Sequence, residues 1–346
     1  MYYKDDSDQL GIDEFFLPFG GKLKKDNRCV KAAEIMPWSY IEEVYLRSMN
    51  QEIGRAAFPA RIAYGAIYVK QQEQLTDEET VTAIAENPYI QYFLGLKEFR
   101  DEPLFDASMM VHFRKRFPFE ELAKINEYIC TGKRPEEEQK DDDGSNDPPS
   151  GASHEEKQSQ AGKRIVSLQQ PHVRPINRGK RPNPTEFGQK LHLSVVDGFT
   201  YLEKTSWNSF NEGKELIDVA EDYRRKFGCY PEAILADRIY QTRENRAFCK
   251  AHDIRLSGPP LGRRKADSTD EKIQGQLYRD ACERNAVEGR NGNAKRRWGL
   301  DLIMSKLEET AKTEAALSII AMNVAHCLAL WLLRFFAFNR FVLVFQ

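Results

Sequence analysis

The feature that most limits the fold of this chain is a polar segment in its middle, residues 132–163, with the sequence GKRPEEEQKDDDGSNDPPSGASHEEKQSQAGK. The segment contains no aromatic residue and no aliphatic residue larger than Ala, and it is rich in acidic residues, Ser, Gly and Pro. Such a composition buries too little apolar surface to offset the conformational entropy that ordering would cost. We therefore predict a disordered acidic linker that separates two domains.

The residues before the linker predict a helical domain. Three stretches carry apolar residues at spacings of three and four, which is typical of amphipathic helices: SYIEEVYLRSM, PARIAYGAIYVKQQ and TDEETVTAIAE. Thr76 followed by Glu79 has the pattern of a capping box. Asn87 and Pro88 start another short helix, and Asp106 is expected to cap a later one. Short helices joined by tight turns suit a DNA-binding module and a generic helical bundle equally well.

After the linker the apolar pattern changes to one that mixes strands and helices. KLHLSVVDGFTYLEKTSW consists of two β-rich runs around Asp197 and Gly198, a strong signal for a two-residue hairpin turn. KELIDVAEDYRRKFG is an amphipathic helix with Gly228 at its C-terminal cap. Next come an expected strand 233–236, a helix 243–252 and a strand 254–256. This order predicts an α+β or mixed α/β domain with a parallel crossover.

The C-terminus carries the longest apolar run, AALSIIAMNVAHCLALWLLRFFAFNRFVLVFQ. Asn323, His326 and Arg334 interrupt it, whereas a membrane span requires about 20 predominantly apolar residues. We therefore expect a buried helix and no membrane partner. The predicted division of the chain is a helical domain 1–131, the linker 132–163, a core domain 164–312 and an apolar helix 313–346.

Bulk charge and cysteine content point to an intracellular protein. The net charge is −2, but this sum hides basic segments that the acidic linker offsets. Six cysteines are scattered without a C-x-x-C pair, so neither a disulfide framework nor a zinc site is predicted. The first 16 residues are acidic and lack an apolar run, so no signal peptide is expected. Reduced thiols fit a cytoplasmic location.

Asp237 is the first candidate functional residue. It follows the expected strand 233–236, and functional groups in open α/β sheets gather just past the carboxyl ends of strands. The alternative is that its carboxylate only caps the turn that follows.

The second candidate group lies in RNAVEGRNGNAKRRWGL. At about 100° per residue, Arg284, Glu288 and Lys295 fall on nearly one face of a helix. A carboxylate flanked by cations suits a phosphodiester ligand, because cations hold phosphates while the carboxylate holds a metal. Further basic residues in this stretch are Arg290, Arg296 and Arg297. The alternative is a solvated helix with ion pairs such as that of Arg284 with Glu288.

Two more basic segments suit contacts with a phosphate backbone. The first is KRIVSLQQPHVRPINRGKRPNPTEFGQK, a Pro-rich stretch with a single acidic residue, Glu186. The second is the loop PPLGRRK. The residues of these segments that we expect to contact DNA include Arg174, Arg178, Lys180, Arg263 and Arg264.

These segments together resemble an insertion-sequence transposase of the DDE class, with a helical N-terminal domain and an RNase H-like catalytic core. The resemblance rests on NPYIQYFLGL, FDASMMVHFRKRF, RIVSLQQPHVRPINRGK, EFGQKLHLSVVDGFTYLEKTSWNSFNEG, ADRIYQTRENRAFCKAHDIRLSGPPLGR and NAVEGRNGNAKRRWGL, in this order. It implies that Asp237 is the second catalytic Asp and Glu288 the catalytic Glu. Of the family signature Y-x2-R-x3-E-x6-K, Arg284, Glu288 and Lys295 match, whereas Ala281 stands at the Tyr position.

The resemblance also implies a cofactor and partners. Such transposases use two divalent ions, Mg²⁺ or Mn²⁺, held by three carboxylates, to cleave and join DNA strands. Their partners are the terminal inverted repeats and the target DNA, and they commonly act as homodimers. The signature Lys would hold a DNA phosphate, and the signature Arg would orient the Glu or a phosphate.

One element of the family pattern is missing. The first catalytic Asp belongs on the first core strand, upstream of the hairpin, where this chain has only the polar linker. The segment 141–143 should not form a strand, Asp197 fits a hairpin turn, and Asp106 fits a helix cap. We therefore expect a shortened transposase with an incomplete RNase H-like core that binds DNA but cleaves it poorly or not at all. The alternatives are an inactive DNA-binding remnant, which would inhibit an intact transposase, and a decayed copy that the missing strand keeps from folding.

Overall fold

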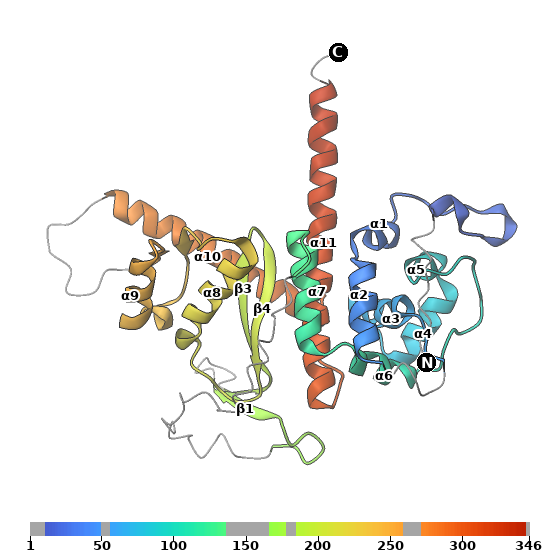
Figure 1. Ribbon diagram of the computed structural model, residues 1–346, viewed down its shortest axis with the longest axis horizontal. Coiled ribbons are helices and arrows are strands. Elements are labelled where there is room, and N and C mark those ends of the chain that lie inside the picture. The colour runs from blue at the N-terminus through green and yellow to red at the C-terminus, as the bar shows by residue number, and fades with distance from the viewer. Residues whose placement is uncertain (1–10, 50–55, 136–165, 178–184, 259–270, 344–346) are drawn as a thin grey trace, which may run out of the picture. The chain divides into compact units, whose positions relative to one another are not determined.

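The computed structural model describes residues 11–49, 56–135, 166–177, 185–258 and 271–343 (Figure 1). Most of the predicted linker, including 141–143, lies outside these residues. The chain forms two units, which we call the helical unit (Met1–Lys133, Leu193–Leu202 and Ser257–Gln346) and the mixed unit (Arg134–His192 and Glu203–Leu256). The predicted α+β class is confirmed.

The N-terminal part of the helical unit contains the predicted run of short helices. They are α1 (Arg28–Ile35), α2 (Trp38–Arg47), α3 (Ala60–Glu73), α4 (Asp77–Glu86), α5 (Pro88–Phe93), α6 (Met109–Arg116) and α7 (Phe119–Thr131), preceded by the 3₁₀ turns η1 (Ile12–Glu14) and η2 (Pro18–Gly20). The capping box is confirmed, because the Thr76 hydroxyl accepts from Glu79 N and the Glu79 carboxylate accepts from Thr76 N. Asn87 accepts from Tyr89 N at the start of α5.

The prediction for Asp106 needs a correction. Helix α6 begins at Met109, and its N-cap is Ser108, whose side chain makes no capping bond. The Asp106 carboxylate accepts a hydrogen bond from Ser108 N at 2.9 Å. It therefore stabilises the turn before the helix, since a short acidic side chain readily bonds the backbone two residues further on.

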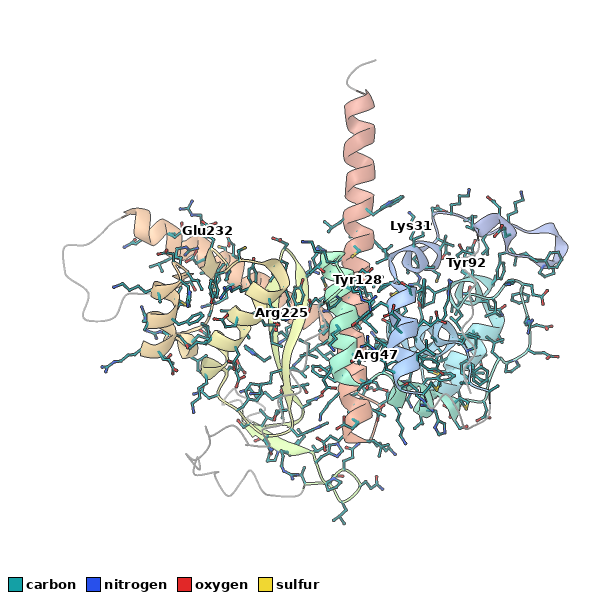
Figure 2. The ribbon with its side chains drawn as sticks, viewed as in Figure 1. Lys31, Arg47, Tyr92, Tyr128, Arg225 and Glu232 are labelled. Atoms are coloured by element: carbon teal, nitrogen blue, oxygen red, sulfur yellow. The ribbon has the colours of Figure 1, made fainter. Side chains whose placement is uncertain are left out.

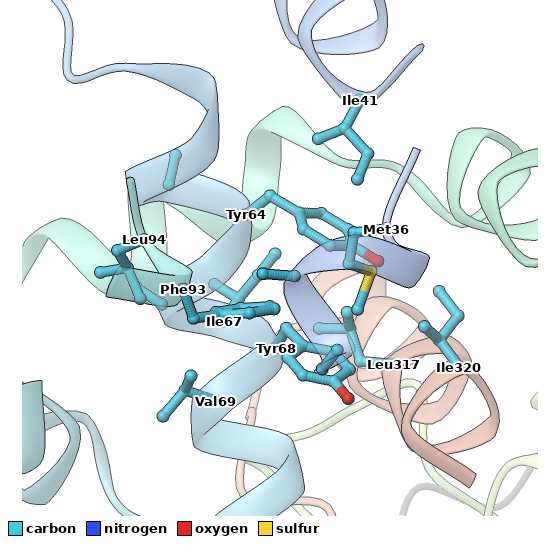
Figure 3. Packing of buried hydrophobic residues seen from close by; sticks show 14 of the residues in the cluster. Met36, Ile41, Tyr64, Ile67, Tyr68, Val69, Phe93, Leu94, Leu317 and Ile320 are labelled. Atoms are coloured by element: carbon cyan, nitrogen blue, oxygen red, sulfur yellow. The ribbon is translucent and has the colours of Figure 1, made fainter. Parts of the chain in front are cut away.

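The C-terminal apolar segment forms helix α11 (Glu308–Leu343), which packs against α1, α3, α6 and α7. Figure 1 shows α7 and α11 side by side. Leu317 and Ile320 of α11 belong to the same buried cluster as Tyr64 and Tyr68 of α3 (Figure 3). The expectation of a buried helix is confirmed over residues 315–324, so the core of the N-terminal helices includes residues from the far end of the chain.

By length and composition, Glu308–Trp331 is the one described segment that could cross a membrane, and 67% of its most apolar window is buried inside the protein. Further along, Trp331 is about half exposed. Lys31 of α1, labelled in Figure 2, has its Nζ atom 3.7 Å from the centre of the Trp331 indole ring. This cation–π contact holds the outer part of α11 against α1.

Buried polar side chains also join α11 to α3. Lys70 Nζ lies 3.2 Å from Glu314 Oε1, and both side chains are less than a tenth exposed. Glu314 additionally accepts hydrogen bonds from Met304 N at 3.0 Å and Ser305 N at 3.1 Å. Buried charges are stable only when paired and hydrogen-bonded in this way, so the network fixes α11 in one register along α3.

Helix α10 (Glu271–Arg297) is anchored to the helical unit by its C-terminal end. Ala294 is fully buried, and Leu300, just beyond the helix, is 8% exposed. Gln71 of α3 donates from Nε2 to the carbonyl oxygen of Trp298 at 2.8 Å. The last turns of α10 are therefore held by the same helices that hold α11.

The predicted hairpin is formed by β3 (Lys190–Val196) and β4 (Phe199–Ser206), which pair with each other. Asp197 and Gly198 have φ values of 51° and 80°. Both residues are thus left-handed, as a tight two-residue hairpin turn requires. The prediction for the turn is confirmed, and Asp197 is a turn residue.

The mixed unit contains the remaining predicted elements. They are β1 (Arg174–Asn177), β2 (Thr185–Gly188), η4 (Glu212–Lys214), α8 (Leu216–Phe227), β5 (Ala233–Ile234), η5 (Arg238–Tyr240), α9 (Arg243–Ala251) and β6 (Arg255–Leu256). Strand β1 pairs antiparallel with β2 and β5 pairs parallel with β6, which confirms the predicted crossover. Gly228 ends α8 with φ 79°.

The described strands form three separate two-stranded sheets. Strand β5 is shorter than predicted because its ladder has only the two residues of β6 as partners.

Candidate active site

Asp237 lies three residues beyond β5, and its side chain is exposed. Its Oδ1 atom accepts a hydrogen bond from Arg238 N at 2.8 Å, and its carbonyl oxygen accepts one from Tyr240 N at 3.1 Å. Asp237 is thus the N-cap of η5. The turn cap is therefore confirmed, and the position just past the end of a strand is as predicted, while the functional role of the carboxylate stays a prediction.

The turn that carries Asp237 is fixed by a close backbone contact with η4. Asn245, which is 1% exposed, donates from Nδ2 to Gly213 O at 2.7 Å and to Tyr240 O at 2.8 Å. A Cβ atom at Gly213 would lie 2.3 Å from Ile239 O. Only glycine fits at this position, so the approach of η4 holds the Asp237 turn in place.

Glu288 is exposed in the middle of α10, and Arg284 and Lys295 are half-buried on the same continuous helix. The structure therefore brings the three signature residues onto one helix, as predicted. Arg296 and Arg297 are exposed at the C-terminal end of this helix. Cations at this end also interact favourably with the helix dipole.

Arg290, part of the same basic stretch, has a structural contact. Its Nη2 atom lies 3.1 Å from His326 Nδ1 on α11, and His326 Nε2 lies 3.4 Å from Asp197 O at the hairpin turn. Burial, reinforced by Arg290, lowers the pKa of His326. The imidazole is therefore neutral at pH 7 and accepts from Arg290 through Nδ1, so Nε2 carries the proton. The contact ties α10, α11 and the hairpin turn together within the helical unit.

The predicted DNA-binding residues outside α10 are only partly described. The Arg174 guanidinium donates to Pro171 O and, at 3.0 Å, to Val173 O. It is thus turned onto the backbone of its own segment. Arg178, Lys180, Arg263 and Arg264 lie outside the described residues.

Carboxylate oxygens such as those of Asp237 and Glu288 are the ligand type that Mg²⁺ and Mn²⁺ prefer. Asp237 belongs to the mixed unit and Glu288 to the helical unit. Within the described residues, no three His, Cys, Asp or Glu side chains are grouped so that they could hold a metal ion. All six cysteines are free.

Sequence reasoning missed the contacts of the polar residues in α11. It treated Asn323 and His326 only as interruptions of a membrane span. Asn323 is fully buried and hydrogen-bonds Asn126 of α7 and Thr200 of β4. A polar residue on the buried face of an apolar helix was the available signal, since buried amides require partners.

Comparisons with known proteins match two parts of the chain. The family model "Transposase domain (DUF772)" matches residues 18–116, and the model "Transposase DDE domain" matches residues 234–325. A protein of Rhizobium meliloti described as "Uncharacterized protein ORF8 in nfe locus" is 38% identical over 98 residues, which are 28% of this chain and 47% of the relative. The chain thus spans about half the length of that relative. No solved structure matches.

The two family matches confirm the resemblance to insertion-sequence transposases of the DDE class. They lie in the expected order, with the helical transposase domain before the DDE domain. A DDE domain implies an RNase H-like fold, and both Asp237 and Glu288 lie within its matched residues.

Proposed function

We propose that this chain is a shortened transposase that binds DNA at the ends of an insertion sequence and cleaves it poorly. The observation that carries the proposal is the arrangement of Arg284, Glu288 and Lys295 on α10, inside the matched DDE domain. An exposed carboxylate between two cations on one rigid helix suits a metal bound next to a DNA phosphate.

Each of these residues has a role in the proposed function. Asp237 and Glu288 would hold Mg²⁺ or Mn²⁺ through their carboxylate oxygens. The metal, when bound, activates the attacking oxygen and stabilises the leaving one. Lys295 holds a phosphate as a point charge, and Arg284 orients either Glu288 or a phosphate. The exposed Arg296 and Arg297 extend the basic surface along the DNA backbone.

Poor cleavage is proposed because the sequence offers no match to the family's first Asp, and the described residues group no three carboxylates that could hold a metal. The family resemblance implies a third carboxylate, the first Asp, which would hold the metals together with Asp237 and Glu288. Within the described residues, the best substitute on the hairpin, Asp197, is held in a left-handed turn conformation, and its carbonyl lies against His326. Two carboxylates alone would bind the metals weakly. We therefore expect the rate of cleavage to be reduced more than the affinity for DNA.

A second candidate function is inhibition of an intact transposase. The observation that favours it is the well-packed helical unit, in which α11 completes the core of the N-terminal helices. A chain that retains this unit can occupy terminal inverted repeats or pair with an intact copy without performing chemistry. Either function would operate in the cytoplasm, with DNA as partner and a second transposase chain as an additional one.

DNA binding is tested by measuring the affinity of the full chain for duplexes that carry the element ends, at several salt concentrations. We expect the logarithm of the binding constant to fall steeply and linearly with the logarithm of the salt concentration, because each phosphate contact releases counterions. A flat salt response would contradict the proposal. Inhibition is tested by adding the chain to a transposition assay of an intact relative.

A further inference from the structure

A chain of hydrogen-bonded side chains in the mixed unit ends at the turn that carries Asp237. His192 Nε2 in β3 lies 2.8 Å from the hydroxyl oxygen of Tyr240 in η5, and the two rings stack with an angle of 18° between their planes. The Tyr240 hydroxyl lies 3.3 Å from Glu212 Oε2, and Lys190 Nζ lies 3.0 Å from Glu212 Oε1. The proposed chemistry uses none of these four side chains.

The hydrogen bonds between His192, Tyr240 and Glu212 all donate in the direction from His192 to Glu212. Burial lowers the pKa of His192, so the ring is neutral at pH 7. Burial and the neighbouring Glu212 raise the pKa of Tyr240, so its hydroxyl keeps its proton. Tyr240 donates this proton to the Glu212 carboxylate, and His192 therefore donates its Nε2 proton to the Tyr240 oxygen. Such a chain is cooperative, and its members hold one another in a single geometry.

Tyr240 is also held by its backbone, and this links its ring to Asp237. Its N–H donates to Asp237 O at 3.1 Å, and its carbonyl oxygen accepts from the buried Asn245 at 2.8 Å. Both the side chain and the backbone of Tyr240 therefore anchor the C-terminal end of the 3₁₀ turn that begins at Asp237. The Tyr240 ring and the Asp237 backbone are thus joined through a single 3₁₀ turn.

We propose that Tyr240, held by His192 and Glu212, is a positioning residue that orients the Asp237 carboxylate for a divalent cation. The binding of a cation there depends on the proposed function, whereas the ordering of the turn does not. Residues that orient metal ligands from behind are worth roughly tenfold or more in metal affinity. The three positions could not be linked from the sequence, because they lie on β3, η4 and η5.

The test compares Tyr240→Phe with Tyr230→Phe in the full chain. Tyr230 is a matched control in the same unit, because its hydroxyl also donates to a carboxylate, that of Glu221, at 2.7 Å. The first readout is amide hydrogen exchange of residues 237–242 without metal. We expect exchange about fivefold faster in Tyr240→Phe, the effect of losing one hydrogen bond, and unchanged exchange in Tyr230→Phe. The second readout is Mn²⁺ affinity from a titration followed by electron paramagnetic resonance, which we expect to fall about tenfold in Tyr240→Phe.

Two variants of His192 make the test specific. His192→Gln keeps a donor close to the position of Nε2 and should preserve the slow exchange of residues 237–242, whereas His192→Phe should not. Unchanged exchange in Tyr240→Phe, or faster exchange throughout α8 and α9 as well, would overturn the positioning role. Faster exchange confined to residues 237–242, together with no Mn²⁺ binding to the wild type, would support the ordering of the turn and refute the metal site of the proposed function.

Discussion

Asn323 of α11 and Thr200 of β4 are joined by two hydrogen bonds in the core of the helical unit. Thr200 N donates to Asn323 Oδ1 at 2.9 Å, and Asn323 Nδ2 donates to Thr200 O at 2.7 Å. Both residues are at most 1% exposed. The side-chain amide thus satisfies the backbone of the hairpin as a neighbouring strand would. Asn126 of α7 joins the pair, donating to Thr200 O at 3.1 Å.

Replacing Asn323 with Ala is expected to destabilise the protein by about 2–3 kcal/mol, because Thr200 N, Thr200 O and Asn126 Oδ1 each lose a hydrogen-bond partner in the core. Urea unfolding of the full chain measures the effect. Asn285→Ala, at an exposed position of α10, is the control and should change stability by less than about 0.5 kcal/mol. Equal stability of the two variants would contradict the role of the network.

Glu314→Ala is expected to cost about 3 kcal/mol, because it leaves the buried Lys70 ammonium without its closest partner. Thermal or urea unfolding measures the loss. The exposed Glu309→Ala is the control. The double change Lys70→Met with Glu314→Leu removes both charges and should cost less than Glu314→Ala alone. If it costs more, the pair contributes by packing and not by charge compensation.

Much of the fold could be predicted because its signals are local. The capping box at Thr76, the turn at Asp197 and Gly198 and the cap at Gly228 each depend on neighbouring residues, and all three are confirmed. The packing of α11 into the N-terminal helices could not be predicted, because apolar periodicity gives the buried face of a helix but not its partner. The prediction that Asp106 caps a helix was wrong, because helix caps and the turns just before helices favour the same residue types.

The candidate site was predictable only in parts. The spacing of Arg284, Glu288 and Lys295 sufficed to place them on one helix, and the apolar run before Asp237 sufficed to place it after a strand. The anchoring of α10 through Arg290 and His326 depends on contacts between distant segments, which no local pattern encodes.

A pH effect follows from the contact of His326 with Arg290. Burial and Arg290 lower the pKa of His326 below its ordinary value of 6.5. The unfolded chain therefore binds the proton more readily, so the stability that this residue contributes is complete above pH 6.5 and is lost as the pH falls below it. We expect the free energy of unfolding to fall more steeply below pH 6.5 in the wild type than in His326→Gln. Parallel pH profiles of the two proteins would be the contrary result.

The basic end of α10 predicts a measurable change in DNA binding. Changing Lys295, Arg296 and Arg297 together to Gln should weaken binding to all duplexes and lower the slope of affinity against salt by about 2 to 3, at roughly 0.9 per phosphate contact. The control is Lys312→Gln, because the Lys312 ammonium is paired with Glu308 and Glu309. An unchanged slope in the triple variant would place the DNA surface elsewhere.

The most direct test of the proposed function is a nicking assay with Mg²⁺ or Mn²⁺ on DNA that carries the element ends, at chain concentrations that saturate binding. The wild type should bind this DNA yet nick it far more slowly than an intact relative does, and the residual nicking should disappear in Asp237→Ala and Glu288→Ala. Metal-dependent nicking by the wild type as fast as that of the intact relative would contradict the account, because it would require a complete set of carboxylates around the metal.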